Sequence, residues 1–230
     1  MSRIAVIPAR GGSKRIPRKN IRPFHGRPMI AYPIRAALQS GLFDRIIVST
    51  DDEEIAAVAR DSGAETPFVR PPELADDHAG TGEVVVHAIR WLIDHGQPVE
   101  ACCCIYATAP FLTPERLREG WRALQTRGKA FAFSATSYAF PIQRAIRLTP
   151  GGGVEMFWPQ HRTTRSQDLE PAYHDAAQFY WGLGTAWLSG VDAFSEAGAA
   201  VILPRAEVVD IDTPEDWEVA EQAYRLLKGI

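Results

Sequence analysis

Residues 3–20 read RIAVIPARGGSKRIPRKN, a short apolar run that passes into a basic, glycine-bearing segment. The apolar run, residues 3–9, predicts a buried strand, and the basic segment predicts a loop at the carboxyl end of that strand. In open α/β sheets, ligands bind at this end of the strands. The loop has neither the phosphate-loop spacing G-x-x-x-x-G-K-[ST] nor the dinucleotide pattern G-x-G-x-x-G.

Apolar segments with strand character alternate with segments of helical spacing along most of the chain. We expect further strands at residues 45–49, 65–69, 101–106, 131–137, 179–181 and 206–211. We expect helices at residues 29–40, 51–60, 83–95 and 214–227, and one that opens at Thr113. The alternation predicts an α/β fold with a Rossmann-like, mostly parallel sheet flanked by helices, in a single domain spanning residues 1–230.

Residues 138–178 interrupt this pattern with four prolines and three consecutive glycines. Residues 144–148 and 154–158 flank the glycines and suit a β-hairpin. We interpret residues 138–178 as a β arm inserted in the domain.

The composition excludes several classes of protein. The 230 residues are 46% hydrophobic and 10% aromatic, which argues against intrinsic disorder. A formal net charge of −3 gives no reason to expect a nucleic-acid partner. No apolar run approaches the roughly 20 residues of a membrane span, and the short apolar start does not suit a signal peptide. The three cysteines, residues 102–104, are consecutive and cannot converge on one metal ion from a strand, so we expect small buried thiols in a cytoplasmic protein.

The loop after the first strand offers groups that suit a polyphosphate. Gly11 and Gly12 allow the backbone to turn tightly and present N–H groups to an anion. Ser13 adds a hydroxyl donor, while Arg10 and Lys14 add charge that can follow phosphate oxygens. A solvated basic loop is the alternative, but the position after a strand favours a polyphosphate site.

Two carboxylates, Asp210 and Asp212, stand two positions apart near the end of the chain. In an extended segment such residues share a face, so both can point to one spot. Mg²⁺ commonly takes one or two carboxylates together with substrate phosphate oxygens. Alternatively, Asp212 only caps the helix that begins at Pro214, which would leave Asp210 unexplained.

Further polar residues follow the other expected strands. Arg70 comes directly after residues 65–69 and could bind a base or a phosphate. Residues 162–178 are unusually polar and would suit an anionic, hydroxyl-rich molecule, with Arg165 on a carboxylate. The sequence contains no G-x-S-x-G nucleophile elbow, and its histidines have no paired metal-ligand spacing.

Several segments together resemble the sugar-acid cytidylyltransferases, the family that makes CMP-activated sialic-type acids. The similar segments, in the order of the family, are residues 7–14, 17–20, 47–51, 70–74, 107–110 and 210–213. Residues 140–145, 165–169 and 173–181 look like the pseudaminic acid branch. Gln143 stands where the N-acetylneuraminate branch is expected to have lysine, and Ala176-Ala177 stands where that branch is expected to have Asn-Gly. Even the pseudaminic branch is expected to have glycine at position 177.

The resemblance implies a nucleotidyltransferase-type fold and Mg²⁺-dependent transfer of CMP from CTP to the anomeric hydroxyl of pseudaminic acid, with release of pyrophosphate. It implies catalytic roles for Lys14, Arg10 and Asp212, and metal binding by Asp210 and Asp212. The implied nucleotide-binding residues are Ala9, Arg10, Gly11, Gly12, Ser13, Lys14, Asn20, Arg70 and Thr81. The implied sugar-binding residues are Gln143, Arg165, His174, Gln178 and Tyr180. It also implies a homodimer in which the arm reaches the neighbouring active site.

Three alternatives remain at this point. The same reaction could act on N-acetylneuraminate, legionaminate or 3-deoxy-manno-octulosonate. A metal-dependent glycosyltransferase also carries a D-x-D on a parallel sheet, but its motif normally follows a mid-chain strand. A non-catalytic regulator would bind CTP without turnover.

Overall fold

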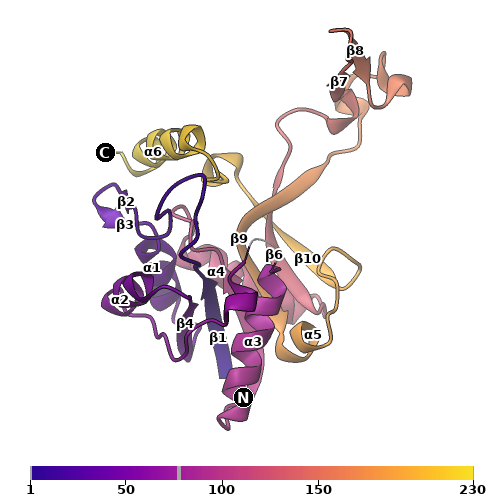
Figure 1. Cartoon of the computed structure of the whole chain (residues 1–230). Coiled ribbons are helices and arrows are strands. Elements are labelled where there is room, and N and C mark those ends of the chain that lie inside the picture. Colours follow the sequence, from indigo (N-terminus) through magenta and orange to yellow (C-terminus); the bar gives the residue numbers. More distant parts are fainter. Residues whose placement is uncertain (1, 77–78, 230) are drawn as a thin grey trace.

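The computed structural model describes residues 2–76 and 79–229 and is built on a six-stranded sheet (Figure 1). At its centre β1 (Ser2–Pro8) lies between β4 (Arg45–Ser49) and β5 (Val99–Ile105), and all three run parallel. Beyond β5 follow β9 (Tyr173–Leu183), β6 (Phe131–Ser137) and β10 (Gly198–Leu203). β6 and β10 are parallel to each other, whereas β9 runs antiparallel to both of its neighbours. The expected mostly parallel α/β sheet is confirmed.

Alternate residues of each central strand pack against different helical layers. Ala5 and Ile7 belong to a core shared with α1 (Ala31–Ser40), α2 (Glu53–Asp61) and α4 (Pro114–Thr126). Ile4 and Val6 face the opposite side, which α3 (Thr81–Asp94) and α5 (Gly184–Leu188) cover. Both faces of the strands are therefore buried, which explains their continuous apolar sequence. The three cysteines follow the same alternation in β5 and are fully buried, as expected.

Two predicted strands are wrong, and among the described strands of the main sheet β10 was not predicted. Residues 65–69 contribute a single bridge, between Glu65 and Ile47, and then leave the sheet with Val69 74% exposed. Residues 206–211 form a 3-10 turn followed by irregular chain, because Ile211 is buried beside Trp217 rather than in the sheet. The strand that pairs with β6 is instead β10, residues 198–203.

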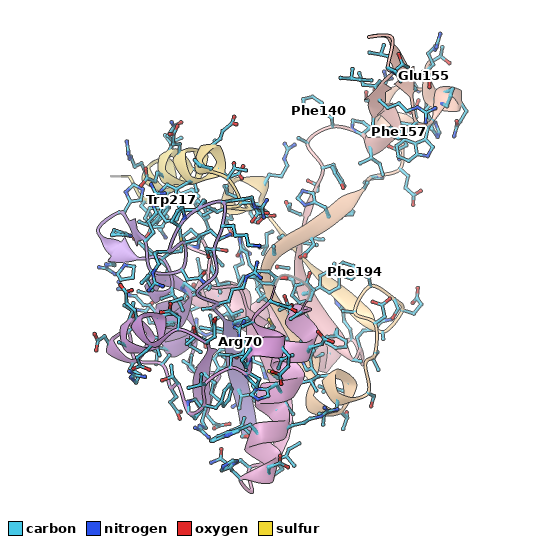
Figure 2. All side chains as sticks on the ribbon, viewed as in Figure 1. Arg70, Phe140, Glu155, Phe157, Phe194 and Trp217 are labelled. Atoms are coloured by element: carbon cyan, nitrogen blue, oxygen red, sulfur yellow. The ribbon has the colours of Figure 1, made fainter. Side chains whose placement is uncertain are left out.

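The arm leaves the sheet between β6 and β9 and projects away from the rest of the molecule (Figure 1). Its tip is the expected hairpin, formed by β7 (Ile146–Leu148) and β8 (Val154–Met156). Large apolar side chains on the arm remain exposed, among them Phe140 at 83% and Leu148 at 79%. Figure 2 shows Phe140, Glu155 and Phe157 on this projection, far from Arg70 in the body.

A separate small core packs residues 16–29, near the start of the chain, against residues 211–220, near its end. α6 (Pro214–Lys228) lies over the hairpin formed by β2 (Pro23–Phe24) and β3 (Arg27–Pro28). Ile16 from the basic loop, Ile211 and Trp217 are each at most 3% exposed in this core. The loop after β1 is thereby packed against the segment that carries the D-x-D pair. Among the described residues, no helix combines the length and apolar character needed to cross a membrane.

The turn between β4 and α2 also binds the loop that follows β1, through Asp51 and Asp52. The N–H of Gly11 donates to Asp51 Oδ1 at 2.9 Å, and Arg18 Nη1 donates to Asp52 Oδ2 at 2.5 Å. Asp52 also caps α2, accepting a hydrogen bond from the Ile55 N–H at 3.0 Å. A Cβ on residue 11 would lie 2.8 Å from Asp52 Oδ2, so only glycine fits beside this carboxylate.

Replacing Asp52 separates its two roles. The hydrogen bond from Arg18 holds the pKa of the Asp52 carboxyl below its ordinary value of 3.8. Asp52→Asn keeps the cap but loses the ion pair, and should lower the free energy of unfolding by about 0.5–1 kcal/mol at neutral pH. Asp52→Ala should cost about 1 kcal/mol more, through the lost cap.

At low pH, wild type and Asp52→Asn should have the same free energy of unfolding. Because the pKa of Asp52 is lower in the folded state, the stabilisation by its ion pair with Arg18 is present above pH 3.8. This stabilisation disappears as the pH falls below that value and Asp52 becomes protonated. Urea unfolding as a function of pH measures this, with Asp94→Asn at the exposed end of α3 as the control. A difference that persists unchanged well below pH 3.8 would contradict the assignment.

Candidate functional site

A polar pocket of about 300 Å³ opens at the carboxyl ends of β1 and β5. Seven residues predicted from the sequence line it: Arg10, Ser13, Lys14, Asn20, Arg70, Thr81 and Asp212. Arg15 and Lys19, which the sequence did not single out, complete the lining together with Tyr106 at the end of β5. The pocket therefore brings together basic groups from the loop after β1 and a carboxylate from the D-x-D segment.

Asn20 holds the shape of the loop. Its side chain is 7% exposed, and its Nδ2 donates to the carbonyl of Arg10 at 3.0 Å. Its own carbonyl accepts from the Ile30 N–H at 2.8 Å. Arg10 in turn extends across the pocket, where its Nη1 donates to the carbonyl of Asp76 at 2.7 Å. In this structure Asn20 acts on the loop backbone, and through it on the placement of Arg10.

The backbone N–H groups of the loop are partly used within the protein. The Gly11 N–H is bound to Asp51, and the Ser13 N–H donates to the Gly11 carbonyl at 2.9 Å. The expectation that Gly11 offers its N–H to an anion therefore does not hold for the conformation described. Ala9, Gly11 and Gly12 do not line the pocket. The groups that do reach it from this loop are mainly side chains.

Arg70 is a buried cation at the floor of the pocket. It is 4% exposed, and its Nε donates to Ser49 Oγ at 3.1 Å. A second guanidinium nitrogen donates to the Ser49 carbonyl. Burial lowers the pKa of Arg70 to about 10, which still leaves it charged at neutral pH. The side chain is thus held rigidly by the end of β4, with its charge facing a polar cavity.

Thr81 and Tyr106 form the wall on the side of α3. Thr81 is the first residue of that helix, and Tyr106 follows β5 directly. Burial raises the pKa of Tyr106 to about 12, while a hydrogen bond with Thr81 acts in the opposite direction. Tyr106 therefore remains a neutral phenol at physiological pH.

Asp212 lies between two cations of the basic loop. Arg15 Nη2 is 2.8 Å from Asp212 Oδ2, and Lys19 Nζ is 3.2 Å from Asp212 Oδ1. Helix α6 is capped by Thr213, whose Oγ1 accepts from the Asp216 N–H at 3.2 Å. The alternative reading of Asp212 as a helix cap is therefore wrong.

Asp210 lies outside the pocket lining, and part of its surface remains in contact with solvent. Partial burial raises the pKa of its carboxyl, and the negative charge of nearby Asp212 raises it further. The two carboxylates are thus close enough to repel each other. This donor set suits a hard divalent cation, which takes carboxylate oxygens and leaves other positions to phosphates and water. Among the described residues, no three His, Cys, Asp or Glu side chains gather into a site that the protein alone would complete.

The predicted sugar-binding residues fall into two groups outside the pocket lining. Gln178 and Tyr180 are on β9, where Gln178 is 4% exposed and its buried Oε1 has no hydrogen-bond partner among the residues that the structure describes. His174, near the start of β9, has its Nδ1 2.8 Å from the Asp175 carbonyl. Gln143 and Arg165 lie on the arm, where Gln143 donates to the Glu170 carbonyl and Arg165 pairs with Asp168.

Asp175 organises the β9 group and was not predicted from the sequence. It accepts hydrogen bonds from the Tyr180 hydroxyl and, at 2.8 Å, from the Ala177 N–H. Ala177 has φ of 48°, in the left-handed region that favours glycine. That backbone conformation gives a physical reason for expecting glycine at this position. Burial and the Asp175 carboxylate raise the pKa of Tyr180, so its hydroxyl stays protonated.

Sequence reasoning also missed Arg15 and Lys19. Both belong to the basic loop that was recognised as a phosphate site, so their charge was visible. Their partner, Asp212, lies 193 positions after Lys19. No local pattern shows which cation of the loop would reach it.

Comparison with known proteins agrees with this geometry. Residues 4–177 match the family described as cytidylyltransferase. The chain is 46% identical over 226 residues to pseudaminic acid cytidylyltransferase of Campylobacter jejuni, covering 98% of this chain and 97% of that protein. It is 32% identical to CMP-N,N'-diacetyllegionaminic acid synthase of Legionella pneumophila, covering 97% and 96%.

The fold has a counterpart among solved structures. CMP:2-keto-3-deoxy-manno-octonic acid synthetase, complexed with CTP, aligns with a TM-score of 0.68 at 15% identity and full coverage of both chains. At that identity the likeness concerns the fold alone. The family match and the 46% identity over nearly the whole chain decide the assignment: this chain belongs to the cytidylyltransferase family.

Proposed function

We propose that this chain transfers CMP from CTP to the anomeric hydroxyl of pseudaminic acid and releases pyrophosphate. The observation that carries the choice of acid is the 46% identity, over 98% of the chain, to a pseudaminic acid cytidylyltransferase. The pocket supports the reaction class, because Arg10, Ser13 and Lys14 line the same cavity as Asp212. The relative named for the legionaminic acid reaction stands at 32% identity.

The side chains of the pocket would position the substrates and neutralise charge. Phosphoryl transfer of this kind needs in-line placement and charge stabilisation more than covalent catalysis. The anomeric oxygen would attack the α-phosphorus of CTP, forming a P–O bond while the bond to pyrophosphate breaks. Lys14 and Arg10 would stabilise the charge that gathers on the leaving pyrophosphate. Asn20, Arg70 and Thr81 would hold the cytidine side of the nucleotide.

Asp210 and Asp212 would hold Mg²⁺. When bound, the ion would offset phosphate charge and lower the pKa of a coordinated hydroxyl. The carboxylate of Asp212 fits this role because it faces the pocket from a segment fixed by Ile211 and the cap of α6.

We further propose that the chain works as a homodimer through its arm. The arm exposes Phe140, Leu148 and Phe157 without a core of its own to bury them. A second copy would cover these side chains. Gln143 and Arg165 would then serve the sugar side of the partner's pocket, beside its β9 group.

The reaction would take place in the cytoplasm. The described thiols of residues 102–104 are free and fully buried, and burial raises their pKa values. Such unreactive thiols suit a reducing compartment.

The substrate is tested by pyrophosphate release with CTP and Mg²⁺ against four acids: pseudaminic, legionaminic, N-acetylneuraminic and 3-deoxy-manno-octulosonic. We expect release with pseudaminic acid, at a kcat/KM at least tenfold above that of any other acid. A preference for another acid would keep the reaction and replace the substrate. Release of a nucleoside diphosphate would indicate a glycosyltransferase, and CTP binding without turnover on any acid would indicate a regulator.

Lys14→Ala should lower kcat by at least about 10²-fold, because charge on the leaving group would lose a direct counter-ion. The KM for the sugar acid should change far less. Lys129→Ala is the matched control, since Lys129 pairs with Glu196 and lies outside the pocket lining. Equal kcat values for wild type and Lys14→Ala would remove Lys14 from the reaction.

A further inference from the structure

The two cations that meet Asp212 differ in how firmly they are held. Lys19 Nζ donates to the Ile211 carbonyl at 2.7 Å as well as to Asp212, and its side chain is 19% exposed. Arg15 approaches the other carboxylate oxygen from the solvent side, with its side chain 64% exposed. An exposed ion pair of this kind is weak and is easily exchanged, whereas the half-buried lysine is fixed by a main-chain bond.

A divalent cation on Asp212 would change the balance of charge at this carboxylate. The single negative charge already faces two positive side chains within 3.2 Å. Even with Asp210 as a second ligand, adding a divalent ion to the same oxygens would gather four positive charges around two carboxylates, so we expect one side chain to withdraw. Arg15 is the side chain that can do so, because it is mostly in solvent.

Arg15 also has a second place to bind. It lines the same pocket as Arg10, Ser13 and Lys14, the groups assigned to the triphosphate. A guanidinium presents a planar fork of N–H donors that matches phosphate oxygens. Its long side chain needs only a rotamer change to exchange one anion for another.

We propose that Arg15 is an exchangeable counter-ion. It neutralises Asp212 in the free protein and moves to a phosphate oxygen of the nucleotide when a divalent cation takes its place on Asp212. The proposal rests on the proposed function, since it takes Asp212 as a metal-binding residue. It explains why one loop carries cations both for the phosphates and for the carboxylate that faces them.

The exchange predicts effects of opposite sign when Arg15 is removed. In Arg15→Ala, Mn²⁺ should bind the nucleotide-free protein about two- to fivefold more tightly, because no ion pair has to break. CTP should bind the Mn²⁺-loaded protein at least about tenfold more weakly, because a charged phosphate contact is lost. If Arg15 had a purely structural role, its removal would weaken the binding of both Mn²⁺ and CTP. Arg15→Lys should behave between wild type and Arg15→Ala.

Electron paramagnetic resonance of free Mn²⁺ and calorimetry with CTP, without sugar acid, measure the two affinities. Arg27→Ala is the control for loss of one exposed positive charge outside the pocket lining, and should change neither affinity beyond twofold. If Arg15→Ala binds Mn²⁺ no more tightly than wild type while Asp212→Asn loses Mn²⁺, the exchange is overturned and the metal site stands. If Asp212→Asn binds Mn²⁺ as wild type does, the metal site fails, and the exchange fails with it.

Discussion

The ion pairs of Asp212 with Lys19 and Arg15 join two segments at opposite ends of the chain, and the pocket depends on this junction. Lys19 and Asp212 are 193 positions apart, and a small core formed by Ile16, Ile211 and Trp217 holds their backbones together. On the other side of the loop, Asp51 and Asp52 bind its backbone and Arg18. Basic side chains of the loop and the Asp212 carboxylate line one cavity, and these two sets of contacts hold their segments in place.

Strand β9 connects this junction with the arm. It enters the sheet antiparallel between β5 and β6 and carries Gln178 and Tyr180 toward the body, while its first residues continue from the projection (Figure 1). Gln178 Nε2 donates to the Glu207 carbonyl, just before the D-x-D segment. The sugar side of the proposed site and the carboxylate side therefore share a hydrogen bond.

Local patterns predicted the elements that are buried on both faces or clearly capped. β1, β4, β5 and β6 have continuous apolar sequence, and helices α2 and α4 begin at Asp52 and Thr113, whose side chains cap them. One of the two mispredicted strands fails because a tertiary contact overrides the local pattern, and the other because the chain leaves the sheet after a single bridge. Ile211 packs under Trp217, and Val69 finds no neighbour in the sheet. β10 was missed because it begins with small residues: a Cβ at Gly198 would lie 1.9 Å from the Ala193 carbonyl oxygen, a requirement that no sequence pattern displays.

For the candidate site too, local sequence patterns predict residues within one segment but not contacts between distant segments. The contiguous loop motif identified Arg10, Ser13, Lys14 and Asn20, all of which line the pocket. The D-x-D motif identified Asp212 as well, but its pairing with Arg15 and Lys19 could be found only in three dimensions.

The most informative single measurement is a crystal structure with CTP and Mn²⁺, in which anomalous scattering locates the metal. We predict a peak about 2.1 Å from a carboxylate oxygen of Asp212 and from an oxygen of the triphosphate, with the triphosphate on Arg10 and Lys14. CTP bound in the pocket with the metal elsewhere, or with Asp212 still paired to Arg15, would contradict the assignment of this carboxylate.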